Sequence, residues 1–259
     1  MHRSSVIVTF RVYGEARPPR RVSLSRSGQT TEATSTSSTV KGSSLVATLL
    51  RVAWLSVLLG LGMEALLLLV AAGSGLVPEL RSIVADSVQK VSWSLIVCAG
   101  LALGTTVSSA LRAPLMGILG FLAAPAAFHV ARTFHQSAKE TLEIAGNVTT
   151  VGSTSVFILA LIKGIEYACL GIAIGWIGRR PWGGLLSHVL VGLAIGILFG
   201  GTILTFTYVS APEPPATAAL IGRGVDEIVF PVGCSFVLFS AQALSNRMAS
   251  EDEEQSKPG

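Results

Sequence analysis

The chain has 259 residues, of which half are hydrophobic and 13% are charged, and its net formal charge is +4. The mean hydropathy is +0.63, and the charged fraction is about half that of an ordinary soluble domain. These values exclude an ordinary soluble fold and indicate a membrane protein. The positive charge gives no signal for nucleic-acid binding, because it lies mainly in the N-terminal segment and beside the ends of apolar runs.

Residues 1–43 form a polar segment ahead of the first apolar run. They include seven Arg or Lys residues and a Ser/Thr-rich stretch at 30–39. No apolar core follows the basic residues at the distance typical of a secretory signal. We therefore predict a disordered basic tail outside the folded core, with an organelle transit peptide or an over-extended start as alternatives.

Six apolar runs follow, each almost free of charge and close to the roughly 20 residues that a helix needs to cross a bilayer. They predict an all-α polytopic membrane protein with six transmembrane helices at 50–72, 91–111, 113–131, 153–177, 185–208 and 226–245. An acidic tail, 248–259, ends the chain.

The distribution of Lys and Arg predicts the orientation. With the N-terminus inside, the inner side receives 13 of these residues and the outer side five, as the positive-inside rule requires. Both termini are then cytoplasmic, and the outer loops are 74–90, with a short interfacial helix, 132–152 and 209–224. The Ala-, Gly- and Leu-rich composition favours a bacterial plasma membrane over an organelle membrane.

Two pairs of segments within the predicted spans resemble each other. Residues 62–73 and 164–175 are identical at five of twelve positions, including a glutamate in the middle of an apolar run. Residues 99–104 and 191–196 are identical at four of six positions. Each match pairs one span with the span three further along the chain.

These matches predict an internal duplication, with one repeat at 44–135 and the other at 136–247. A unit of three spans is odd, so the second copy enters the membrane from the opposite side. The result is a 3+3 inverted repeat, an architecture that recurs in secondary transporters and some channels.

Glu64 and Glu166 occupy the same position in the two matched segments, near the middle of their spans. Charged residues are rare at that depth and usually functional. Burial favours the neutral form of a carboxyl group, so such a group can take up and release a proton or bind a cationic ligand. Lys163 is the nearest predicted partner of Glu166, one helical turn away. The alternative for each glutamate is a neutralised or protonated residue that only packs.

Secondary candidates lie at the ends or bends of the predicted helices. Asp226 and Glu227 open the last span, where we expect an interfacial or helix-capping role. Pro125 and Pro231, which align weakly between the repeats, either line a cavity or kink their helices. Four glycines spaced for close packing of helices are expected on spans two and five: Gly100, Gly104, Gly192 and Gly196.

The sequence contains no motif for a catalytic, metal or cofactor site, and we expect neither enzymatic activity nor a cofactor. The expected partners are the lipid bilayer and a small solute or ion, with no nucleic acid. The predicted function is a small secondary transporter or exporter that uses the buried carboxylates as coupling or binding groups. The alternative is a non-catalytic membrane subunit or assembly factor, bound to partner membrane proteins or to a second copy.

Overall fold

A computed structural model describes residues 36–75, 78–106, 110–142, 153–211 and 216–255. The chain divides into two units, Met1–Thr39 and Val40–Gly259. Most of the predicted tail, residues 1–35, lies outside the described residues. The described residues form six helices: α1 (Thr36–Gly73), α2 (Leu80–Thr105), α3 (Arg112–Thr141), α4 (Ser153–Ile177), α5 (Leu185–Ser210) and α6 (Thr217–Gln255).

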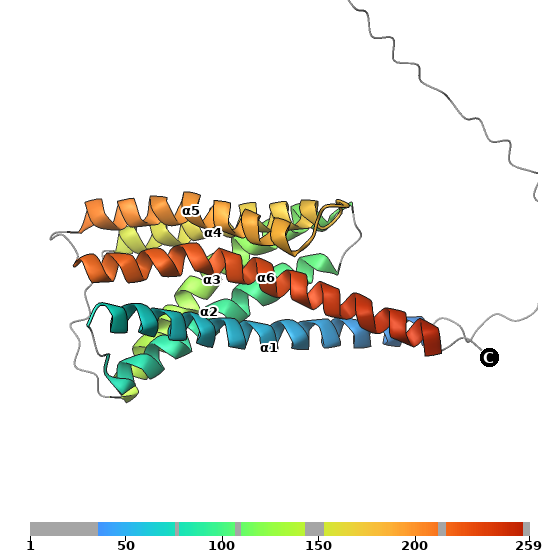
Figure 1. The fold of residues 1–259 in the computed structure, drawn as a ribbon, viewed down its shortest axis with the longest axis horizontal. Helices are drawn as coiled ribbons and strands as arrows, with labels where there is room; N and C mark the ends of the chain where they lie inside the picture. Colours follow the sequence, from blue (N-terminus) through green and yellow to red (C-terminus); the bar gives the residue numbers. More distant parts are fainter. Residues whose placement is uncertain (1–35, 76–77, 107–109, 143–152, 212–215, 256–259) are drawn as a thin grey trace, which may run out of the picture. The chain divides into compact units, whose positions relative to one another are not determined.

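Successive helices run antiparallel through the second unit (Figure 1). The C-terminal ends of α1, α3 and α5 and the N-terminal ends of α2, α4 and α6 all lie at one end of the bundle, on the left of Figure 1. We call this end the α1–α2 end. The main helix contacts join α2 with α3, α3 with α4, α4 with α5 and α5 with α6, and α6 also packs against α2 and α4.

All six helices contain a segment long and apolar enough to cross a bilayer, between 22 and 30 residues in length. Many large apolar side chains on these helices are exposed, such as Trp54, Leu122 and Leu198. An outward-facing apolar surface of this kind suits lipid rather than water. The all-helical fold and the number of candidate spans are therefore confirmed.

Three predicted loops are shorter than expected. Residues 74–90 are not a loop with an interfacial helix, because α2 already begins at Leu80; similarly, α3 continues to Thr141 and α6 begins at Thr217. The predicted boundary between the repeats, at 135, therefore falls inside α3. Charged residues favour a loop in these segments, but α2 continues through 80–90 with two polar contacts to other helices: Lys90 with Glu64 of α1, and Asp86 with His135 of α3.

Glycines let the helices approach closely. A Cβ added to Gly104 of α2 would lie 2.5 Å from a side-chain carbon of Met116 on α3, and one added to Gly196 of α5 would lie 2.5 Å from the carbonyl oxygen of Ile228 on α6. Gly100 and Gly192 make equally tight contacts on the same pairs of helices. The predicted packing role of the four glycines is confirmed.

Helix α1 rests against α2 and α6. The Ser94 hydroxyl of α2 donates a hydrogen bond to the Ser56 carbonyl of α1 over 2.7 Å, and Leu59 of α1 packs over Gly233 of α6. Between α2 and α6, the buried thiols of Cys98 and Cys234 lie 3.5 Å apart. The core thus joins residues from both halves of the chain.

Candidate functional site

A cavity of about 410 Å³ lies among five of the helices, toward the α1–α2 end. Its volume is within the range of small-molecule sites. Its wall combines charged and aromatic side chains, an unusual lining inside an apolar bundle. The lining residues are Leu67, Gln89, Lys90, Trp93, Phe128, Ala131, Arg132, Val156, Leu159, Lys163, Gly222, Arg223, Asp226, Glu227 and Phe230.

Lys163 is the centre of a buried ionic network. Its Nζ lies 2.9 Å from Oε2 of Glu166, one helical turn along α4, and also contacts the Glu227 carboxylate of α6. Arg223 Nε approaches the other oxygen of Glu227 at 3.8 Å. Glu166 is fully buried. The predicted Lys163–Glu166 pair is therefore present, but the lysine is shared with a second carboxylate.

Aromatic rings complete the surroundings of Lys163. Its ammonium lies 5.8 Å from the ring centroids of Trp93 and of Tyr167, a distance at which ring faces attract cations. Trp93 in turn meets the rings of Phe128, Tyr167 and Phe230 edge to face. This packing restricts the position of the lysine at the cavity wall.

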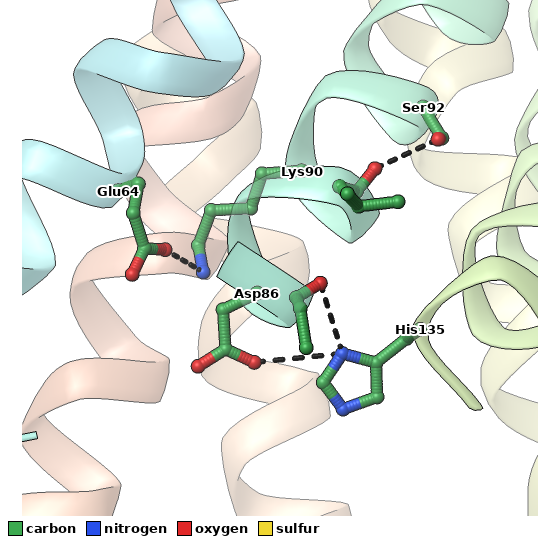
Figure 2. A network of polar contacts seen from close by, with 7 residues as sticks. Glu64, Asp86, Lys90, Ser92 and His135 are labelled. Carbon is green, nitrogen blue, oxygen red and sulfur yellow. Dashed lines mark hydrogen bonds and ion pairs between the residues drawn. The ribbon is translucent and has the colours of Figure 1, made fainter. Parts of the chain in front are cut away.

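Glu64 forms a second ion pair with a lysine of the cavity wall. Figure 2 shows its carboxylate on α1 pointing toward Lys90 of α2, with Oε2 2.6 Å from Nζ. Both side chains are largely buried. One turn earlier on α2, Asp86 lies 3.5 Å from the ring of His135 on α3, in the same view. Polar contacts thus connect α1, α2 and α3.

The two predicted central carboxylates, Glu64 and Glu166, do not themselves line the cavity. Their lysine partners, Lys90 and Lys163, stand between them and the space. The charge of each glutamate can therefore act on an occupant through the position of its lysine. The two arrangements differ, because Glu64 takes a lysine from another helix and Glu166 takes one from its own.

Asp226 and Glu227 are cavity residues inside α6, so the helix-capping role expected for one of them is wrong. Helix α6 begins at Thr217, about two and a half turns earlier. Both residues line the cavity. Glu227 is buried and forms ion pairs with both Lys163 and Arg223.

The two prolines lie within helices and do not line the cavity. Pro125 of α3 packs beside Gly164 of α4. The carbonyl of Pro231, in α6, accepts a hydrogen bond from the Ser235 hydroxyl over 2.9 Å. Pro231 also deprives the Glu227 carbonyl of its helical donor, and this carbonyl lies beside Gly200 of α5. Both prolines contribute to helix packing.

Sequence reasoning missed three cations of the wall: Lys90, Arg132 and Arg223. One signal could have found Lys90. Two antiparallel helices joined by a turn bring residues equidistant from that turn to the same depth, and residue 77 lies midway between positions 64 and 90. A buried Glu64 carboxylate calls for a cation at the same depth. Lys90 lies at the equivalent distance from the turn and is such a cation.

No group of three His, Cys, Asp or Glu side chains among the described residues could hold a metal ion. Of the two histidines inside predicted spans, His188 places its Nδ1 2.9 Å from the Gly184 carbonyl of its own helix and packs against Phe239. His129 is exposed on α3.

Comparisons with protein-family models, with curated proteins and with solved structures found no match. The function is therefore inferred from the arrangement of the charged and aromatic side chains described above.

Proposed function

We propose that the protein is a small secondary transporter or exporter whose solute binds in the cavity. The observation that carries this proposal is the cavity itself: about 410 Å³, lined by charged side chains in the middle of apolar helices. Keeping charges there is costly, and such residues commonly mark the path of a substrate or ion. A purely structural bundle would need neither the space nor the charges.

The ion pairs supply a means of coupling. Protonation of Glu64 would remove its attraction for Lys90, and the released ammonium faces the cavity. In the same way, an occupant that attracts Lys163 competes with Glu227. In our proposal, proton binding and solute binding both change the positions of the cavity side chains. Each therefore alters the affinity for the other, which is the thermodynamic requirement for coupling.

We further propose that the two halves of the chain are inverted repeats. The sequence matches support this, and so does helix packing: the glycines of α2 approach α3, and the aligned glycines of α5 approach α6. The charges are not repeated. Glu166 of α4 has Lys163 on its own helix as a partner, and this lysine also contacts the Glu227 carboxylate of α6. In this proposal the halves share a framework but not a binding role.

We propose a bacterial plasma membrane as the location, with both termini cytoplasmic and the α1–α2 end outside. Gly222 lines the cavity near that end, and Gly184 follows α4 at the opposite end. A Cβ added to either meets nothing within 4 Å. In a background lacking the three native cysteines, Gly222→Cys in intact cells should react with a membrane-impermeant maleimide. Gly184→Cys should react only after permeabilisation.

The reverse labelling pattern would overturn the orientation. Labelling of both positions from the same side would overturn the six-span topology. Because a Cβ at either glycine meets nothing within 4 Å, a clash of the new side chain does not explain either pattern.

Transport can be tested without knowing the solute. Proteoliposomes loaded with a mixture of amino acids, carboxylic acids and amines should release at least one solute faster than protein-free vesicles when a pH gradient is applied. Glu64→Gln should slow that release by at least about tenfold, equivalent to roughly 1.4 kcal/mol, because it removes the ionisable partner of Lys90. Mass spectrometry of the released solutes gives the readout.

Glu140→Gln is the matched control, because Glu140 is exposed near the end of α3 and does not line the cavity. Its release rate should equal that of the unmodified protein. Absence of release from folded, correctly oriented protein would refute transport and favour the alternative of a membrane subunit or assembly factor. Such a subunit should co-purify from native membranes with a stoichiometric partner.

A further inference from the structure

The charges around the cavity balance. The wall carries four cationic side chains and two carboxylates: Lys90, Arg132, Lys163, Arg223, Asp226 and Glu227. Glu64 and Glu166 lie behind the wall and pair with its two lysines. Counted together, four positive and four negative groups surround the space, so an occupant with a net charge would unbalance a poorly solvated region.

Two of these groups lack a partner within the part of the chain that the structure describes. No carboxylate oxygen there lies within 4.0 Å of the Arg132 guanidinium, and no cationic nitrogen lies within 4.0 Å of Asp226. Asp226 Oδ1 is buried and accepts no hydrogen bond. An unsatisfied buried carboxylate oxygen is costly and indicates a place for a donor.

We propose, building on the transport function above, that the cavity binds a small zwitterion. Its ammonium group contacts Asp226 of α6, and its carboxylate contacts Arg132 of α3. Such an occupant satisfies both unpaired groups and leaves the charge balance of the cavity unchanged. A solute with only one of the two charges would leave either Arg132 or Asp226 without a partner.

The rest of the wall indicates what the solute carries beside its two charges. Trp93, Phe128 and Phe230 line the same cavity, and Trp93 holds the other two rings in edge-to-face contact at 6.5 and 6.3 Å. An apolar or aromatic remainder gains by contact with these rings. The chemical class is therefore that of α-amino acids with an apolar side chain.

Matched ligands test this inference on the full chain purified in detergent. L-Phenylalanine is compared with 3-phenylpropionate, which lacks the ammonium group, and with phenethylamine, which lacks the carboxylate. Alanine, propionate and ethylamine form a second, smaller set. Isothermal titration should show that the zwitterion of at least one set binds at least about tenfold more tightly than either of its analogues.

Two substitutions assign the charges. Arg132→Gln should lower the affinity for the zwitterion to about that for the amine, with little effect on the amine itself. Asp226→Asn should lower it to about that for the carboxylic acid. Lys139→Gln and Glu140→Gln, on α3 outside the cavity wall, should change none of the affinities. If Arg132 and Asp226 had only structural roles, each cavity variant would lower the affinity for all ligands by the same factor. That result would overturn the assignment.

The outcomes separate this inference from the proposed function. If neither zwitterion binds, or if a singly charged analogue binds as tightly in both sets, the zwitterion proposal is wrong, whatever the vesicles release. If vesicles release an anion or a cation instead, the transport proposal is supported and the proposed substrate class is wrong. If a zwitterion binds as expected but no solute crosses the membrane, the proposed binding site is supported and the transport proposal is wrong.

Discussion

Lys163→Met is expected to lower the free energy of unfolding by about 3–5 kcal/mol, the cost typical of breaking a buried ion pair by removing one partner. The lysine is the cation that both Glu166 and Glu227 contact. Among the described residues, Glu166 has no other ionic partner, and it is 0% exposed. Thermal unfolding in detergent, followed by circular dichroism, measures the loss.

The sharing of the lysine predicts an asymmetry. Glu166→Gln should cost less than Lys163→Met, because Lys163 keeps Glu227 as its partner. The double change Lys163→Met with Glu166→Met should recover much of the stability, because Glu227 then retains Arg223. If solute release stays lost in this stable double variant, the pair has a role beyond folding.

Lys139→Met is the matched control, because it removes the same charge from the last turn of α3, at a residue that does not line the cavity. It should leave the midpoint of unfolding nearly unchanged. A Lys163→Met protein as stable as this control would mean that the two carboxylates are neutral or solvated in the folded protein.

The contact between α3 and α4 should be the most sensitive to added volume. A Cβ on Gly171 would overlap the Met116 carbonyl, and one on Gly120 would overlap the Tyr167 carbonyl. The obstacles are backbone atoms of the facing helix, so relief requires the helices to separate. We expect Gly171→Ala and Gly120→Ala each to destabilise the protein by about 1–3 kcal/mol.

Gly201→Ala provides the control for the glycine substitutions. Gly201 is also within a helix, but an added Cβ there meets nothing within 4 Å. Alanine at an open helical position is neutral or stabilising by about 0.5–1 kcal/mol. If Gly171→Ala and Gly201→Ala have equal unfolding midpoints, close packing between α3 and α4 does not limit stability.

The number and type of the helices could be predicted because charge-free apolar runs of bilayer length have few other solutions. The helix ends could not be predicted, because a charged residue can stand either in a loop or inside a helix. Lys90 lies well inside α2, where Glu64 neutralises it. Whether a charge ends a span depends on a partner in another helix, and that information is absent from the local sequence.

The sequence predicted only a part of the candidate site. Glu166 and Lys163 are neighbours on one helix, so their spacing alone predicted the pair. Glu227 as a second partner of Lys163 depends on the packing of α6 against α4, which periodicity does not determine. The functional roles of Glu64 and Glu166 stay predictions that the substitutions above will test.

The position of Trp93 gives the protein an optical reporter of its own. This indole lies in the cavity wall, whereas Trp54, Trp176 and Trp182 are 66%, 44% and 54% exposed. Replacing those three by Phe would leave one tryptophan, whose emission depends on the polarity and charge immediately around it. Entry of a ligand, expulsion of water or movement of the Lys163 ammonium could then be followed in real time without any attached label.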